Sequence, residues 1–287
     1  MKRTLLVLAS LSVLVACAEG PAPVSPRDAV LDAMSAVYEA GTYHQELEMS
    51  LSAEGQSFSI TGVADVDNER QKIDMTMDLG LLGGEMQVVM DGGIVYMRSP
   101  AFADAPTPWV SMDPEKMDPA RAAQFGGFGA GTTDPSAYAG LFAGVFDVKD
   151  SGQVEIRGVS TTHYVGTIDL EKVMASFSDM MGEDVDPATK EQLEAAVKQF
   201  ETLGIDQKIP FEIWIDEEGL PRRQAITMDF GDAVPGAGDA SLEMTVDYSA
   251  FGEPVRVQIP KRSQVTDVTD LMGGAASEDD SRSGAYG

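Results

Sequence analysis

Much of the chain alternates apolar and polar residues with a period of two. In one segment Met75 and Met77 are apolar, while Asp74, Thr76 and Asp78 beside them are polar. Such alternation is typical of an antiparallel sheet with one face covered and the other in water. We therefore expect the two methionines to face the covered side and the three polar residues to face water. The pattern predicts strands over 47–51, 58–66, 72–79, 86–90, 94–97, 161–165, 211–215, 225–230 and 242–248, with a turn at 216–219.

Other segments repeat their apolar residues with helical spacing. Ser25-Pro26 is a helix-start signal, and the segment after it predicts an amphipathic helix that stops at Gly41. Residues 170–181 and 193–200 have the same one-sided spacing. Asp-Pro pairs, which also favour helix starts, occur at 113–114, 118–119, 134–135 and 186–187. The predicted fold is α+β: a large curved antiparallel sheet with amphipathic helices packed on its apolar face.

The N-terminus predicts export and lipid attachment. Lys2 and Arg3 precede an apolar run over 5–16, which is shorter than the roughly 20 residues of a spanning helix and is typical of a signal peptide. The run ends in Leu14-Val15-Ala16-Cys17, which has the form of a lipobox. We expect lipidation at Cys17, which would anchor the protein to the extracytoplasmic face of the cell membrane. The alternative is a free thiol that happens to end an apolar stretch.

These patterns divide the chain into four parts. Residues 1–16 are the expected signal peptide, and residues 17–24 are the lipidated cysteine with a short tether rich in proline and small residues. Residues 25–272 form one domain, or two halves that share one sheet. Residues 273–287 contain little to bury and are expected to be disordered.

Charge and residue usage exclude several function classes. The net charge of −27 argues against binding nucleic acid, which requires basic patches. The chain has two histidines, His44 and His163, and Cys17 is its one cysteine, so we expect no metal, no cofactor and no enzyme activity. His163 lies in a strand-like segment and is interpreted as structural. The glycine-rich stretch 126–131 lacks the lysine of a phosphate-binding loop and is interpreted as flexible.

Methionine is unusually frequent at the inward strand positions. Methionine is flexible and polarisable, so it suits surfaces that accept varied apolar shapes, although it also fills ordinary cores. Both interpretations stay open for this set. The candidate lipid-contacting residues are Met49, Met75, Met77, Met86, Val88, Met90, Met228 and Met244.

The order of motifs resembles the actinobacterial LppX/LprAFG lipoprotein family, which is related in fold to the carriers LolA and LolB. The similar pieces include DAVLDAMSAVYEAGTYH, DGGIVYMR followed by PWVSMD, RGVSTTHYVGTIDL, IPFEIWIDEEGLPRRQAITMDF and YSAFGEPVRVQIP. The resemblance implies a curved half-barrel with a hydrophobic cavity under its helices. It also implies binding of an acylated lipid or glycolipid and its movement across the cell envelope, with a lipid transporter as a further partner. Only Cys17 carries over residue by residue.

Two functions therefore remain. The first is a membrane-anchored lipoprotein that binds and carries an acylated lipid. The second is a structural or partner-binding envelope lipoprotein with a packed, ligand-free core. An unfilled, elongated apolar pocket would favour the first, because a close-packed core leaves no room for a ligand.

Overall fold

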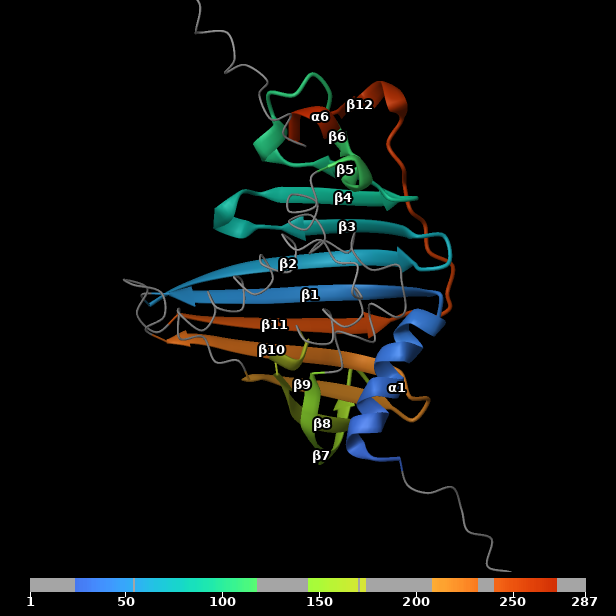
Figure 1. The fold of residues 1–287 in the computed structure, drawn as a ribbon, viewed down its shortest axis with the longest axis vertical. Helices are drawn as coiled ribbons and strands as arrows, with labels where there is room; N and C mark the ends of the chain where they lie inside the picture. Colours follow the sequence, from blue (N-terminus) through green and yellow to red (C-terminus); the bar gives the residue numbers. More distant parts are fainter. Residues whose placement is uncertain are drawn as a thin grey trace, which may run out of the picture.

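One twelve-stranded sheet dominates the computed structural model, which describes residues 24–53, 55–117, 144–169, 171–173, 208–231 and 240–272 (Figure 1). Helix α1 (Pro26–Glu39) precedes the sheet, and the short α6 (Thr269–Met272) follows it. The strands are β1 (Thr42–Ala53), β2 (Gln56–Asp67), β3 (Lys72–Asp78), β4 (Glu85–Asp91), β5 (Ile94–Arg98), β6 (Trp109–Met112), β7 (Val145–Ile156), β8 (Val159–Asp169), β9 (Lys208–Asp216), β10 (Pro221–Gly231), β11 (Ala240–Ser249) and β12 (Val265–Asp267). The described residues also form the 3₁₀ turns η1 (Gly80–Leu82), η2 (Pro100–Phe102), η3 (Pro114–Lys116) and η5 (Arg262–Gln264).

The strand order is β12-β6-β5-β4-β3-β2-β1-β11-β10-β9-β8-β7. Neighbouring strands are antiparallel except for the short parallel pair of β12 with β6. The sheet is curved and not closed, which confirms the curved antiparallel sheet predicted from the alternating pattern and the half-barrel implied by the resemblance. The first and last thirds of the chain meet at its centre, where β1 pairs with both β2 and β11.

The pairing register separates the two faces of the sheet. Residues directly opposite each other in antiparallel strands project to the same side. Met49 is opposite Ile60 of β2 and Met244 of β11, and Met77 is opposite Met86 of β4. We call the side that carries these methionines the apolar face. The other side carries residues such as Glu46 and is called the polar face.

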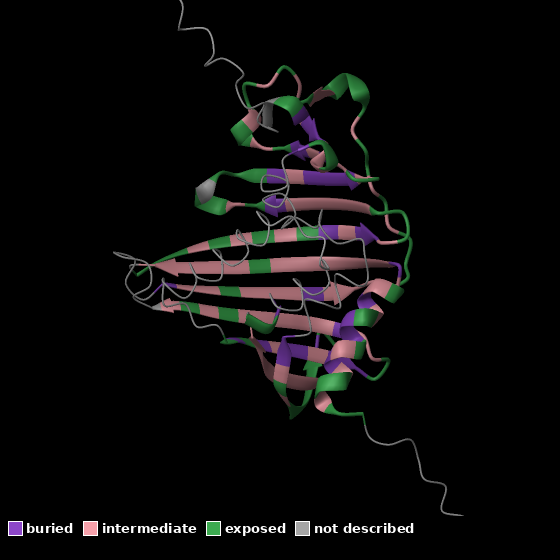
Figure 2. Cartoon of the chain, viewed as in Figure 1, coloured by how far each residue is buried: buried purple, intermediate pink, exposed green. Residues whose placement is uncertain are grey.

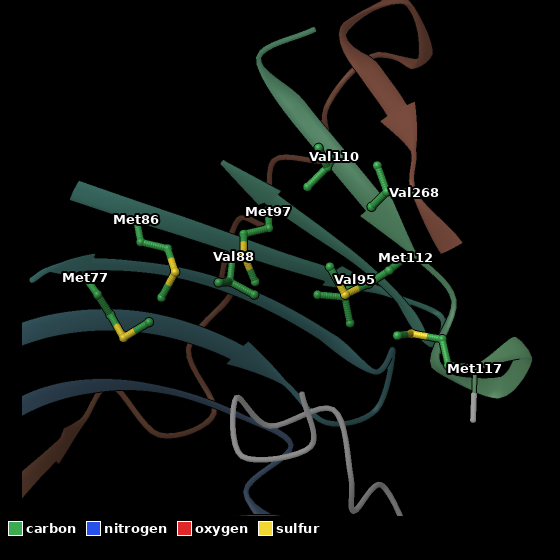
Figure 3. Packing of buried hydrophobic residues seen from close by; sticks show 9 residues of the cluster. All are labelled: Met77, Met86, Val88, Val95, Met97, Val110, Met112, Met117 and Val268. Carbon is green, nitrogen blue, oxygen red and sulfur yellow. The ribbon is translucent and has the colours of Figure 1, made fainter. Parts of the chain in front are cut away.

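The apolar face is buried in two separate clusters. The first, which we call the β3–β6 cluster, combines side chains of β3, β4, β5 and β6 with Met117, just after η3, and Val268, just after β12 (Figure 3). Its buried members are Met77, Met86, Val88, Val95, Met97, Val110, Met112, Met117 and Val268. The second, the α1 cluster, packs the inner side of the helix against β7, β9 and β10 at the other end of the sheet. Its buried members are Val30, Ala33, Met34, Val145, Phe211, Ile213 and Ile215.

Helix α1 forms as its sequence predicts. The side-chain oxygen of Ser25 accepts a hydrogen bond from the backbone N–H of Asp28 at 3.1 Å, and Pro26 is the first helical residue. The helix ends before Gly41, whose φ of 75° favours glycine. Because α1 covers the last strands of the sheet, it completes one flank of the apolar face.

One helix-start signal gives only a short turn, and most of the other predicted helices lie outside the described residues. The Asp113-Pro114 signal begins only the three-residue 3₁₀ turn η3, because the chain leaves helical geometry again at Met117, with ψ of 161°. The other Asp-Pro pairs, and the helices predicted over 170–181 and 193–200 except for Glu171–Val173, lie outside the described residues. Strands β6, β7 and β12 were not predicted.

Candidate functional site

All eight candidate residues lie on the apolar face. Met228 is opposite Leu242, next to Met244 along the face, and Met244 is opposite Met49. Across β3 and β4, the opposite pairs are Met75 with Val88, Met77 with Met86, and Ile73 with Met90. The register thus brings the candidates from β1, β3, β4, β10 and β11 onto one surface. Contact of any of them with lipid stays a prediction.

Burial divides these candidates into two groups. Met77, Met86, Val88 and Met90 are between 2 and 8% exposed. The first three belong to the β3–β6 cluster, where side chains from β5, β6 and the C-terminal segment cover them (Figure 3). The half-buried candidates are Met49, Met75, Met228 and Met244.

Three of the half-buried candidates, Met49, Met228 and Met244, belong to a larger apolar area in the middle of the sheet, whereas Met75 packs against the β3–β6 cluster. Most inward side chains of the central strands β1, β11 and β10 are only partly covered, and the buried exceptions are Ala240 and Pro221 near the strand ends (Figure 2). We call this area the central apolar area. Besides Met49, Met228 and Met244, it includes Leu47, Leu51, Phe58, Ile60, Ile226, Leu242 and Val246. It lies between the two buried clusters, so the apolar face is packed at its flanks and partly covered at its centre.

One end of the central apolar area has a different chemistry. The rings of Tyr43, Tyr248 and Phe251 lie within 5.9 to 6.3 Å of one another. The amide of Gln224 contacts the sulfur of Met34 on α1 at 2.7 Å. Aromatic rings and amides therefore mark the end beside α1, and aliphatic and methionine side chains fill the rest.

The polar face carries a chain of four charged groups. Arg157, at the tip of the β7–β8 hairpin, donates to both carboxylate oxygens of Glu46 at 2.6 and 2.9 Å and lies 2.8 Å from Asp247. Arg223 donates to both oxygens of Asp247 at 2.5 and 2.7 Å. Glu46 and Arg157 are 111 residues apart in sequence, so no local pattern could reveal this network.

These ion pairs shift the pKa values of the two carboxyl groups. The hydrogen bonds from Arg157 hold the pKa of Glu46 below its ordinary value. Burial alone would raise the pKa of Asp247, but hydrogen bonds and charge from Arg223 and Arg157 outweigh it and lower that pKa. Both groups are therefore held as carboxylates at neutral pH.

Two grooves lie outside the apolar face. The first, of about 380 Å³, lies on the polar face beside the charged network and is lined by residues of β1, β2, β3, β10, β11 and Arg157. The second, of about 510 Å³, lies along the β5–β6 connection and is lined by Phe102 and by Pro100, Pro106 and Pro108. Neither groove is predicted by a motif in the sequence, because each is formed by the way the chain folds.

The histidines are part of the polar face. His163 stacks on Trp214 with ring centroids 4.3 Å apart, and its Nε2 lies 2.6 Å from a carboxylate oxygen of Glu212. The Nδ1 of His44 lies 2.8 Å from Asp65. Neither histidine lies in a group that could hold a metal ion, because the described part of the chain contains no cluster of three metal-ligating side chains.

The expected anchor lies outside the described residues. Cys17, the signal peptide over 1–16 and the tail over 273–287 are in segments that the structure does not describe. Within the segments it does describe, no helix has the length and apolar character needed to cross a bilayer.

Comparisons with known proteins give remote matches. No protein-family model matches the chain. An uncharacterized 31.2 kDa protein of Streptomyces griseus, from the rplA–rplJ intergenic region, is 32% identical over 131 residues. That match spans 45% of this chain and 38% of the relative, so the chain matches well under half of that protein.

Among solved structures, lipoprotein LppX of Mycobacterium tuberculosis matches with a TM-score of 0.46 and 16% identity, over 81% of this chain and 98% of LppX. LprF from Mycobacterium bovis matches with a TM-score of 0.45 and 15% identity, over 82% of this chain and 96% of LprF. The chain resembles LppX and LprF. A LolA superfamily protein from Nitrosomonas europaea matches at a TM-score of 0.29 and 8% identity, over 85% of this chain and 99% of that protein. Likeness at this level concerns the fold, so function has to come from the residues of this chain.

Proposed function

We propose that this protein is a membrane-anchored envelope lipoprotein that binds the acyl chains of a lipid or glycolipid on its apolar face and carries that lipid across the cell envelope. The observation that carries the proposal is the central apolar area. Leu47, Met49, Val246 and Met244 lie on adjacent strands, point to one side and are only half-buried, whereas Met77 and Val88 on the same face are fully packed. Apolar side chains left partly uncovered between two packed clusters are suited to an apolar ligand.

The energy available on such a surface is sufficient for a lipid. Removing apolar surface from water is worth about 25 cal/mol per Å², or about 0.8 kcal/mol for each buried methylene. Ten buried methylenes would contribute about 8 kcal/mol, and micromolar affinity needs about the same. The methionines suit this role because their flexible side chains adapt to chains of different shape.

The test is lipid occupancy of the mature domain. We expect organic extracts of the purified protein to contain an acylated lipid at a fixed molar ratio, measured by mass spectrometry. Met49→Trp adds bulk at the centre of the area, directly opposite Met244 and Ile60, and should lower the lipid ratio while the melting temperature stays close to that of the parent.

The matched control places the same bulky residue on the other side of the sheet. Glu243 is exposed, lies on β11 next to Met244 and belongs to the polar face, so Glu243→Trp should leave lipid occupancy unchanged. Absence of lipid from the parent, together with a clear fall in melting temperature for Met49→Trp, would instead indicate a packed structural lipoprotein. Overpacking a filled core typically costs about 1–3 kcal/mol.

Anchoring is tested separately. We expect Cys17→Ser to move the protein from the membrane fraction to the soluble fraction, because the thiol that would carry the lipid is gone. Since that variant could retain its signal peptide, the same comparison is made with the mature domain behind an ordinary secretory signal. Membrane association of this cysteine-free domain would contradict anchoring through Cys17.

A further inference from the structure

The groove of about 380 Å³ on the polar face is bounded on one side by the charged network. Arg157 forms this wall, and its side chain is 52% exposed while it bonds Glu46 and Asp247. Arg223 lies beside Asp247, which is only 8% exposed. These four groups neutralise one another, so the wall carries no excess charge.

The rest of the groove is formed by two rows of side chains that cross the strands. In the first row, Glu48 of β1 is opposite Thr245 of β11 and Thr61 of β2, and Thr61 is opposite Asp78 of β3. Glu48 and Asp78 are exposed, and no cation of the described residues pairs with either at salt-bridge distance. They are two strands apart, or about 10 Å at a strand spacing of about 4.8 Å.

The second row has an apolar residue at its centre. Val63 of β2 is opposite Glu46 of β1 and Thr76 of β3, and is 46% exposed. An exposed valine between threonines and carboxylates is an apolar contact point on an otherwise polar floor. Across the strands, Val63 lies between the positions of Glu48 and Asp78.

We infer that this groove binds an extended segment of a partner protein in which two basic residues flank an apolar one. The basic side chains reach Glu48 and Asp78, and the apolar side chain covers Val63. Alternate side chains of an extended chain point to the same side, so residues i, i+2 and i+4 face the groove together. The outer two lie about 13 Å apart, and flexible basic side chains at these positions reach inward to carboxylates about 10 Å apart. The exposed guanidinium of Arg157 is then available to a backbone carbonyl of the bound segment.

Charge selects this occupant over a second copy of the chain. The chain has a net charge of −27, so two copies repel each other, whereas a basic segment is attracted from a distance. The groove lies on the side of the sheet opposite to the proposed lipid surface. The segment and the lipid therefore do not compete for the same surface.

The test uses the mature domain and a fluorescein-labelled peptide, Gly-Lys-Ser-Val-Ser-Lys-Gly, in a fluorescence anisotropy titration at low salt. The paired variant Glu48→Gln/Asp78→Asn should weaken binding about tenfold, since each exposed ion pair contributes up to about a factor of five. Asparagine at position 78 keeps the side-chain oxygen that accepts from the N–H of Gly80 at 2.9 Å, so the turn is preserved.

Two controls separate a groove from general attraction. Glu217→Gln/Glu218→Gln makes the same charge change in the exposed β9–β10 turn and should alter affinity less than twofold. Val63→Ser should weaken binding about threefold, whereas Val154→Ser, at a valine 42% exposed on β7, should not.

Three outcomes would overturn the proposal. Equal losses of affinity in Glu48→Gln/Asp78→Asn and in Glu217→Gln/Glu218→Gln would mean that only the net charge of the domain attracts the peptide. Equal affinity of the Val63→Ser variant and the parent for the peptide would contradict an apolar contact with Val63. No binding by the parent at millimolar peptide, or self-association of the domain through this face in sedimentation, would exclude a basic segment as its occupant.

Discussion

Exchanging Met77 for aspartate tests the assignment of the two faces most directly. Met77 is 5% exposed in the β3–β6 cluster and lies over Gly62, so close that a side chain added at Gly62 would come within 3.0 Å of the Cγ of Met77. Truncating a buried methionine costs about 2–5 kcal/mol. An unpartnered buried polar group adds about 1–3 kcal/mol.

Together these terms destabilise Met77→Asp by about 3–8 kcal/mol. For a domain of this size, each kcal/mol corresponds to about 2–4 °C in melting temperature, so the expected fall is roughly 6–30 °C. The measurement is thermal unfolding followed by circular dichroism, with urea unfolding as a second probe. Met77→Leu, which nearly conserves volume, should cost less than about 1.5 kcal/mol.

The neighbouring residue provides the control. Thr76 is half-buried on the polar face, opposite Val63 and Gln87. Thr76→Asp meets only repulsion from Asp74 and Asp78 and should cost less than about 1 kcal/mol. Equal losses of stability at positions 76 and 77 would refute the assignment of the two faces.

Two further predictions concern packing and pH. Gly166→Ala should destabilise the protein by about 1–3 kcal/mol in urea unfolding, because its new Cβ would lie 2.6 Å from Cε1 of Phe211. Combining it with Phe211→Leu should remove most of that added cost. Strictly additive losses of stability in the double variant would contradict the contact. Arg157→Ala should lower the melting temperature at pH 7 but much less at pH 3. The pKa values of Glu46 and Asp247 are depressed in the folded protein from their ordinary values of 4.5 and 3.8. The stability that these two carboxylates contribute is therefore present above those ordinary values and is lost as the pH falls through the lower folded-state pKa values. The same difference in melting temperature at both pH values would contradict that prediction.

The strands that the sequence predicted are those with one covered face. Alternation around Met75 or Met244 is a local signal, because burial of every second residue imposes a period of two along each strand. Strand β7 lacks this signal because most of its residues from Lys149 to Glu155 are exposed, and β12 is too short to show a pattern.

The candidate surface could be predicted only in part. Sequence placed all eight candidates on one face, but it could not distinguish Met90, which is packed, from Met49, which is half-covered. That difference depends on which neighbouring strands and segments cover each position. Val88 and Met90 lie in packed surroundings, so Met49 is the better position at which to test lipid binding with a bulky substitution.

The polar groove could not be predicted at all. Its wall depends on Arg157, which lies at the β7–β8 turn with a φ of 50° and meets Glu46 only because the hairpin reaches the centre of the sheet. No spacing of residues along the sequence predicts such a contact.

The unclosed sheet leaves β7 as a long edge strand. Edge strands present unpaired backbone groups that can recruit another chain and start aggregation. In β7 the pairing with β8 shifts register twice, between Phe146 and Lys149 and between Asp150 and Gln153, and Asp147 has a φ of 55°. Such irregularities bend an edge and interrupt its hydrogen-bonding template. The kinked edge therefore keeps an open half-barrel from extending itself into fibrils with its neighbours, so the sheet can stay open without polymerising.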